Sequence, residues 1–475
     1  MTNLVQKTLR RLDARLVGRV SMPGDPGYAN ATAIWAKPVG PMPCAVAHCQ
    51  TTGDVKSAIL AAHDCDLALS VRGGGHDWAG RALCEGLVID LSGMNGVEAD
   101  LENCTARIGG GARASDVAKI TDPLRLAAVT GACSAVGMTG LTLGGGYGPL
   151  IGRFGLALDN LLAAEVVLAD GRIVLVKSDN EPELFWALRG GGGNFGVVTM
   201  MHHRLHDVPS VRSGMLIYPF TEAHTVLRGC AEVASSAPEE LTFQVGFVFG
   251  PEGTPVIIVI PTWAGAPEQG ETQLAPLLQL GTLLANTVTE MPYATALTIF
   301  DPYLVYGQRE WMETCWLPSF DGRNIDGLIQ AAETSVSPGC AVFTHEFKGA
   351  ASRASADETA FHLRRDHVLV EILATFANGS DPRVEQRHRE WARATRDLFI
   401  ATALPGGYPN LLAGDDLGRV AKSYGGNAER LIKAKRRYDP DNVFRSIPLP
   451  VMTAKASAHG GRATTEISNQ GGHTR

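Results

Sequence analysis

Residues 131–148 read GACSAVGMTGLTLGGGYG, and glycine occupies seven of these 18 positions. So much glycine would destabilise a packed helix or strand, because glycine loses the most backbone entropy on folding and has no side chain to pack. A backbone that approaches a ligand closely explains the composition better. We therefore expect residues 131–148 to contact a bound cofactor or substrate.

A second glycine cluster, RGGGHD at residues 72–77, follows a predicted strand. Consecutive glycines can expose backbone N–H groups that bind a phosphate-bearing cofactor. His76 lies at the edge of this loop. A histidine in such a place is otherwise a surface or hydrogen-bonding residue, and the loop alone does not distinguish the two roles.

A third cluster, GGGNFG at residues 191–196, fits the G-x-G-x-x-G pattern of dinucleotide-binding proteins. That pattern binds a dinucleotide only where it follows a strand and precedes a helix. Here the order is reversed, since a predicted helix, Leu184–Leu188, precedes the glycines and the β-branched run Val197–Thr199 follows them. The sequence therefore argues against a Rossmann site and for a glycine helix stop with a tight turn.

Composition and charge limit the class of protein. The chain has 475 residues, 45% of them hydrophobic, which suggests two or three domains. The formal charge is −7, and no dense basic run precedes a short group typical of a polar helix face, namely Lys433, Lys435, Arg436 and Arg437. Nucleic acid and membranes are therefore poor candidates as partners. No apolar run reaches the ~18 residues of a transmembrane helix.

Cysteine usage and the N-terminus point to an intracellular protein. The nine cysteines are odd in number, contain no C-x-x-C pair and fit neither a zinc site nor a disulfide framework. Most are expected to be buried thiols, with Cys133 set apart from the rest. Met1–Val20 carries basic residues but no apolar core of signal-peptide length. We predict a cytoplasmic protein without a metal site.

The first part of the chain is predicted to be a mixed α/β domain, because short β-branched runs alternate with helical segments between Ala45 and about Asp207. The predicted strands are Leu67–Val71, Leu87–Leu91, Cys104–Ile108, Ala164–Leu168 and Ile173–Val176. The predicted helices are Asp54–His63, Ala114–Thr121 and Pro182–Arg189.

After about Pro209 the pattern changes to that of a second, α+β domain with an antiparallel sheet backed by helices. Apolar residues occupy every second position in Leu241–Phe247, which predicts a strand with one face on a core. The other predicted elements are strands at Val256–Ile260, Cys340–Phe347 and His367–Phe376, and helices at Thr272–Leu280, Ile325–Thr334 and Val384–Phe399. Residues 406–448 return to helices and turns, and the polar tail 452–475 is predicted to be disordered.

Four motifs in this order resemble the berberine bridge enzyme family of FAD-linked oxidases, which has the vanillyl-alcohol oxidase fold. They are RGGGH at 72–76, G-x-C-x-x-V-G-x-x-G with its LGGGYG continuation at 131–148, LFWALRGGG at 184–192 and YDPDNVF at 438–444. The resemblance implies an FAD-binding domain of the PCMH type at 38–210, a substrate-binding domain at 211–404 and a C-terminal segment at 405–450 that completes the FAD domain.

The resemblance also implies two covalent bonds to FAD. His76 matches the histidine that bonds the flavin 8α-methyl carbon, and Cys133 matches the cysteine that bonds C6. Both bonds are chemically reasonable, because an imidazole nitrogen and a thiolate are nucleophiles that can add to an electron-poor ring.

Other positions are implied to line the cofactor. They are Arg72, Gly73, Gly74, Gly75, Asp77, Gly131, Val136, Gly137, Gly140, Gly144, Gly145, Asn160, Gly196, Val198, Asn410 and Asn442. Val136 matches the position that governs oxygen access to the reduced flavin, where valine is typical of an oxidase. The alternative is simply a core valine.

Tyr408 and Asn410 match the Tyr-x-Asn motif of the family, in which the tyrosine removes a substrate proton while hydride leaves for flavin N5. A free phenol has a pKa near ~10, so Tyr408 acts as a base near neutral pH only where its site stabilises the phenolate. The alternative is a tyrosine packed under the flavin. The chain departs from many relatives at residues 446–450, where SIPLP replaces an amide-rich segment.

The implied reaction is oxidation of a C–H bond beside a hydroxyl or amine of a small metabolite or sugar. Molecular oxygen would reoxidise the flavin and give hydrogen peroxide. A flavin dehydrogenase with another electron acceptor and a non-catalytic FAD-binding protein are the alternatives. Two predicted strands carry further residues that could face the flavin or form buried structural pairs, namely His345, Glu346, His367 and Glu371.

Overall fold

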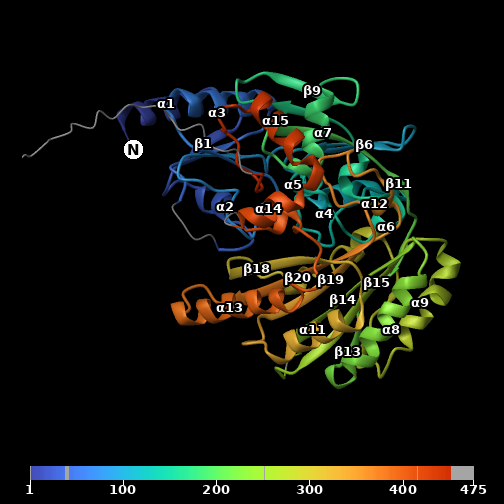
Figure 1. Ribbon diagram of the computed structural model, residues 1–475. Coiled ribbons are helices and arrows are strands. Elements are labelled where there is room, and N and C mark those ends of the chain that lie inside the picture. Colours follow the sequence, from blue (N-terminus) through green and yellow to red (C-terminus); the bar gives the residue numbers. More distant parts are fainter. Residues whose placement is uncertain (1, 38–41, 251, 414–415, 451–475) are drawn as a thin grey trace, which may run out of the picture.

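Two packed halves make up the computed structural model, which describes residues 2–37, 42–250, 252–413 and 416–450. In Figure 1 the first and last parts of the chain form the upper half, and the middle of the chain forms the lower half. The predicted disordered tail at 452–475 lies outside the described residues.

A four-stranded sheet with the order β1-β2-β4-β3 begins the upper half. Its strands are β1 (Arg19–Ser21), β2 (Ala45–His48), β3 (Leu69–Arg72) and β4 (Leu87–Asp90), and the helices beside it are α1 (Asn3–Asp13), α2 (Tyr28–Thr32) and α3 (Thr52–Asp64). Strands β2, β4 and β3 are parallel. The apolar face of α1 packs on this sheet through Val5, Leu9 and Leu12. The RGGGHD loop begins at the carboxyl end of β3, where parallel sheets commonly bind ligands.

A second, antiparallel sheet of five strands has the order β5-β6-β10-β8-β9. Its strands are β5 (Val97–Asp100), β6 (Thr105–Gly109), β8 (Leu161–Val167), β9 (Ile173–Lys177) and β10 (Val197–Arg204). The helices of this part are α4 (Ala114–Thr121), α5 (Met138–Gly144), α6 (Ile151–Phe154) and α7 (Pro182–Gly191), and β7 (Leu126–Ala127) pairs with β11 (His206–Asp207). Gly190 and Gly192 have positive φ where α7 ends, and β10 follows. The helix-before-strand order that argued against a Rossmann site is therefore confirmed.

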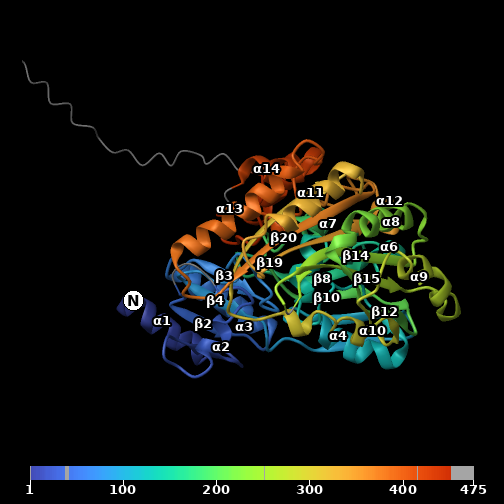
Figure 2. The ribbon, with the colours of Figure 1, turned by 90° about the horizontal axis from the view of Figure 1, so that it is seen from below.

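A nine-stranded antiparallel sheet forms the lower half, with the main order β16-β13-β15-β14-β19-β20-β18. Its strands are β12 (Val211–Ser213), β13 (Leu216–Pro219), β14 (Leu241–Phe249), β15 (Pro255–Trp263), β16 (Ala285–Asn286), β17 (Thr289–Met291), β18 (Arg309–Leu317), β19 (Cys340–Phe347) and β20 (His367–Phe376). The helices in this stretch of the chain are α8 (Ala223–Ser236), α9 (Gly270–Leu278), α10 (Tyr293–Ala296), α11 (Gly322–Glu333), α12 (Ala350–Arg353) and α13 (Pro382–Leu398). Of these, α10 contacts α4 and α12 contacts α6 of the upper half. Figures 1 and 2 show α8, α11 and α13 on the face of the sheet that points away from the upper half.

The C-terminal segment returns to the upper half through α14 (Leu417–Ser423) and α15 (Ala428–Tyr438). The basic group on α15 does not form one polar face, because Lys435 is buried. Its Nζ lies 2.6 Å from Asp439 Oδ2 and donates to the carbonyls of Asn194 and Phe444. The interpretation of these four residues as a solvated face is therefore wrong for Lys435, whose charge is compensated inside the fold.

The fold class predicted from the sequence is confirmed. The bounds of β19 and β20 are those predicted from the sequence, whereas β14 and β15 run longer than the predicted Leu241–Phe247 and Val256–Ile260. The extra residues extend the hairpin in continuous register from Leu241↔Trp263 to Phe249↔Pro255, so cross-strand pairing lengthens both strands.

Candidate functional site

The two glycine loops meet backbone to backbone. A Cβ atom built on Gly74 would lie 2.4 Å from Gly137 Cα, and one built on Gly137 would lie 2.6 Å from the Gly74 nitrogen. Any side chain at either position would force the loops apart. The contact therefore explains these two glycines and brings the loops of His76 and Cys133 into one region.

His76 lies just after β3 with its ring stacked on Trp35, at 4.5 Å between centroids and 1° between planes. Its Nδ1 is buried and has no hydrogen-bond partner among the described residues. Burial, and next the positive charge of Arg113, lower the pKa of His76 to about 4. At neutral pH the ring is thus a neutral imidazole with an unpaired nitrogen, which can act as a nucleophile.

Cys133 lies in the loop that leads into α5. Its neighbour Ser134 fixes this loop, because the Ser134 N–H donates to the carbonyl of Leu297 at 2.9 Å and its hydroxyl donates to Asp301 at 2.7 Å. Burial raises the pKa of the Cys133 thiol to about 12, and the carboxylates of Glu371 and Asp301 act in the same direction. The sulfur is therefore a protonated thiol at neutral pH in this structure, and the thiolate is its minor form.

The predicted base and its companion lie against the same glycine stretch. Tyr408 is fully buried just before a short 3₁₀ turn, and its oxygen accepts the N–H of Gly146 at 2.7 Å. Asn410 donates to the carbonyl of Gly140 at 3.2 Å. Burial raises the pKa of Tyr408 above its usual value, while the Gly146 N–H acts to lower it. The phenol thus receives one bond that would favour a phenolate, but burial outweighs that bond.

The glycines beside Tyr408 are required by its packing. A Cβ on Gly144 would lie 2.1 Å from Asn410 Oδ1, and a Cβ on Gly145 would lie 2.7 Å from the Tyr408 oxygen. Gly145 also has a φ of +143°, which side-chain-bearing residues rarely adopt. The composition of residues 131–148 is therefore explained partly by Tyr408 and Asn410 themselves.

One face of the large sheet adds an acidic group to this region. Glu371 on β20 accepts a hydrogen bond from Tyr147, and its Oε2 lies 3.1 Å from His345 Nε2 on β19. Despite this short distance, His345 Nε2 has no hydrogen-bond partner among the described residues. Burial raises the pKa of Glu371 to about 8 and lowers that of His345 to about 3, so both side chains are mostly uncharged at pH 7.

Of the four residues on the two strands, the structure brings only His345 and Glu371 to this cluster. Glu346 follows His345 directly on β19, so its side chain points to the opposite, helix-covered face. Its carboxylate oxygen Oε2 lies 3.4 Å from Lys348 Nζ. His367 stacks on Phe347 at 4.5 Å and bonds to the carbonyl of Arg365, which makes it part of the packing.

Several residues expected near FAD have protein partners. Arg72 donates to Asp90 at 3.0 Å and to the carbonyl of Ala33, Asp77 accepts the N–H groups of Ala79 and Ala82, and Asn160 bonds to Phe154, Leu156 and His206. These side chains shape the loops. The remaining positions expected near FAD lie on loops or at the start of a strand. They are Gly73, Gly75 (φ +74°), Gly131 beside Val136, Gly196 just before β10, Val198 in β10, and Asn442 (φ +53°) after α15.

Two residues that the sequence analysis did not single out join the cluster. Tyr147 lies edge-on to Tyr408 at 5.0 Å between centroids, and an aromatic residue inside the LGGGYG run was the available signal. Arg81 donates to the backbone carbonyls of Asn410 and Leu412. No local pattern marks Arg81, because its partners are more than 300 residues away.

Comparison with known proteins identifies the family. Residues 43–177 match the model of the FAD binding domain, and residues 397–447 match that of berberine and berberine-like proteins. The chain is 30% identical over 452 residues to the FAD-linked oxidoreductase YvdP of Bacillus subtilis, a match that covers 91% of this chain and 98% of that protein. The chain belongs to the berberine bridge enzyme-like family of FAD-linked oxidoreductases. The resemblance stated from the motifs is thereby confirmed.

Other members of the family and of its fold are enzymes with different names. The chain is 34% identical over 280 residues to (R)-6-hydroxynicotine oxidase of Paenarthrobacter nicotinovorans, covering 58% of this chain and 61% of that protein. The crystal structure of 6-hydroxy-D-nicotine oxidase from Arthrobacter nicotinovorans matches with a TM-score of 0.81 and 29% identity, covering 90% of this chain and 97% of the other. Carbohydrate oxidase from Microdochium nivale shares the fold, with a TM-score of 0.80, 23% identity and coverage of 95% and 100%.

The residues present fit FAD. The buried Nδ1 of His76 lacks a partner among the described residues, the two glycine loops contact each other through Gly74 and Gly137, and Cys133 lies on the second of these loops. Within the part of the chain that the structure describes, no helix combines the length and apolar character that a bilayer span requires.

Proposed function

We propose that this oxidoreductase is an oxidase whose FAD is bonded to both His76 and Cys133. It removes a hydride from a C–H bond beside a hydroxyl or amine of a small metabolite or sugar, and molecular oxygen then yields hydrogen peroxide. The observation that carries this proposal is the contact between Gly74 and Gly137, which brings the loops of the two nucleophiles together. Bound FAD supplies the two-electron acceptor.

We also propose a division of the chain into an FAD-binding part and a substrate-binding part. Residues 38–210 and 405–450 form the FAD-binding part, and residues 211–404 form the substrate-binding part. Strand β1 pairs with β2, and α1 packs on the same sheet, so we add residues 3–36 to the FAD-binding part.

A pocket beside the cluster supports an uncharged or cationic substrate. It is lined by Ala132, Tyr147, Gln244, His345 and Glu346 among other residues, and no Lys or Arg of the described chain is among them. A carboxylate or phosphate substrate would find no cation there to offset its desolvation. Hydroxyl and amine groups can instead bond to the Gln244 amide or the His345 nitrogen.

Two groups are candidates to accept the substrate proton. Tyr408 is the residue expected from the motif, and the Gly146 N–H would stabilise its phenolate. Glu371 has the pKa closer to neutrality, about 8, which suits a general base. We propose that Tyr408 accepts the substrate proton. Glu371 is the second proton acceptor of the cluster, and Tyr147, which donates to Glu371, lies edge-on to Tyr408.

The attachment of the flavin is tested first. After acid precipitation the parent protein should stay yellow, and mass spectrometry of its peptides should find flavin on both His76 and Cys133. His76→Ala and Cys133→Ala should each retain flavin through the other bond. Because the Cys133 thiol is protonated at neutral pH, its bond should form about tenfold faster per pH unit between pH 7 and 9. Complete release of flavin from the parent protein would refute covalent attachment.

The proton acceptor is tested by anaerobic flavin reduction with the compound that bleaches the flavin in a screen of alcohols, sugars and amines. Tyr408→Phe keeps the ring volume and should reduce ~10²–10⁴-fold more slowly if the phenol is the base. Glu371→Gln should remove a rise in rate with pH near 8. Glu346→Gln is the matched control, since the carboxylate of Glu346 pairs with Lys348, whereas Tyr147 donates to Glu371.

Parental rates in both Tyr408→Phe and Glu371→Gln would refute the proposed acid–base chemistry. Oxygen consumption by the reduced enzyme distinguishes the oxidase from a dehydrogenase. Reoxidation by air much slower than reoxidation by an artificial quinone would favour the dehydrogenase.

A further inference from the structure

The segment that carries Tyr408, residues 404–412, is held mainly by groups from other elements. It contains only a short 3₁₀ turn, Pro409–Leu411, and its remaining backbone groups need partners elsewhere. The Leu404 N–H donates to the Trp316 carbonyl at 2.7 Å, and the Gly407 N–H donates to the Ser423 hydroxyl at 3.0 Å. The position of Tyr408 is therefore set by the elements that surround this segment.

Arg419 on α14 joins this segment to the edge of the large sheet. Its Nε donates to the Gly406 carbonyl at 3.3 Å, and its Nη2 donates to the carbonyl of Thr314 on the edge strand β18. Thr314 is the cross-strand partner of Glu371. A single planar guanidinium thus connects the Tyr408 segment to the strand position beside Glu371.

The fit around this guanidinium is tight. A Cβ on Gly407 would lie 2.7 Å from Arg419 Nη2, and Gly406 has a φ of +91°. Two adjacent glycines therefore allow the backbone to lie against the arginine directly before Tyr408.

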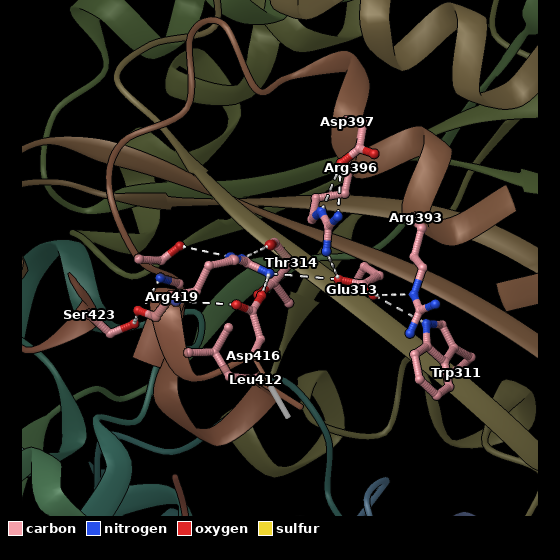
Figure 3. Close-up of polar contacts among 12 residues, drawn as sticks. Trp311, Glu313, Thr314, Arg393, Arg396, Asp397, Leu412, Asp416, Arg419 and Ser423 are labelled. Atoms are coloured by element: carbon pink, nitrogen blue, oxygen red, sulfur yellow. Dashed lines mark hydrogen bonds and ion pairs between the residues drawn. The ribbon is translucent and has the colours of Figure 1, made fainter. Parts of the chain in front are cut away.

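A buried carboxylate holds Arg419 from the other side. Glu313 on β18 is 7% exposed, and its carboxylate lies 3.7 Å from Arg419 Nη1 and 2.9 Å from Arg396 Nη1. Figure 3 shows Glu313 between Arg419 on one side and Arg393 and Arg396 on the other. Asp416 adds a second carboxylate at 3.4 Å from Arg419 Nη1. Two negative charges thus compensate the guanidinium, and of the two carboxylates Asp416 accepts a hydrogen bond from it.

We propose that Arg419, oriented by Glu313, is a positioning residue that sets the place of Tyr408 relative to Glu371. The inference rests on the proposed function only in giving Tyr408 a part in catalysis. Arg419 satisfies carbonyls of both the sheet edge and the Tyr408 segment, so its loss would leave two buried acceptors without a donor and would free the segment to move. Arg396 contacts the same Glu313 but bonds to no residue of 404–412.

The experiment places 3-fluorotyrosine at position 408 of the holoenzyme and records its ¹⁹F resonance in two variants. Arg419→Met should shift or broaden the resonance, and amide exchange in residues 404–411 should become about tenfold faster, corresponding to roughly 1.4 kcal/mol. Arg396→Met removes the closest partner of Glu313 and should keep the parental resonance and exchange. A parental resonance in Arg419→Met, or equal changes in both variants, would overturn the proposal.

Two further variants keep the test decisive if Arg419→Met folds poorly. Arg419→Lys retains the charge but cannot reach both carbonyls, so it should shift the ¹⁹F resonance in the same direction. Glu313→Gln should produce a smaller shift, because Asp416 still pairs with Arg419. Unchanged resonances in both would overturn the proposal. If Tyr408→Phe reduces flavin as fast as the parent while the resonances shift as expected, the proposed role of Tyr408 as the base fails and the positioning role of Arg419 remains.

Discussion

The two sides of the site are built in different ways. On the FAD-binding side, the absence of side chains makes the structure possible, since Gly74 and Gly137 approach closer than any Cβ would permit. On the sheet side, the alternation of side chains decides which partners a residue meets, so that His345 lies beside Glu371 and Tyr147 whereas Glu346 pairs with Lys348. A glycine loop can therefore be recognised locally, whereas the role of a strand residue depends on the register of its neighbours.

The largest effect is expected from adding one methyl group where the glycine loops touch. Gly74→Ala places its Cβ 2.4 Å from Gly137 Cα, so the loops must separate, and bound flavin should fall to a small fraction of the parental amount. Gly96→Ala is the matched control, because its Cβ would meet no atom within 4 Å and Gly96 is not among the positions expected to line the cofactor. The ratio of flavin absorbance to protein measures both. A full complement of flavin in Gly74→Ala would show that the close approach is not required.

An intermediate effect is expected on the sheet side, in the dependence of stability on pH. The folded protein raises the pKa of Glu371 from 4.5 to about 8, so it binds this proton more tightly than the unfolded chain does. That contribution to stability is complete below pH 4.5 and is lost as the pH rises through 8, at about 1.4 kcal/mol per unit of pKa difference.

Glu371→Gln should remove this dependence, and the apoprotein should therefore lose less stability than the parent between pH 5 and 8. Urea denaturation at several pH values measures the difference. Parallel curves for parent and variant would contradict the raised pKa of Glu371.

The smallest effect is expected at Val136, a half-buried residue on the FAD-binding side whose position lies beside Gly131. Leucine adds one methylene beside Gly131, and overpacking costs about 1–3 kcal/mol where it is accommodated. Val136→Leu should slow reoxidation by oxygen several-fold while leaving anaerobic reduction nearly unchanged. Stopped-flow measurement of both half-reactions tests this, and Val136→Ala should reoxidise at least as fast as the parent.

The sequence by itself determined the features that depend on neighbouring residues. Glycine spacing identified both loops, alternation of apolar residues located β14, and four ordered motifs indicated the family. These signals can be recognised in the sequence because backbone conformation, strand alternation and close approach to a ligand each constrain residues within a few positions of one another.

Only the tertiary structure decided which distant groups act together. It placed Glu371 rather than Glu346 beside Tyr147 and Tyr408, buried Lys435 against Asp439, and brought Arg81 and Arg419 to the Tyr408 segment. These contacts join residues far apart in the chain, and their pKa values follow from burial that packing creates. The physical reason is that strand register and domain packing, which set both distance and desolvation, are properties of the folded chain as a whole.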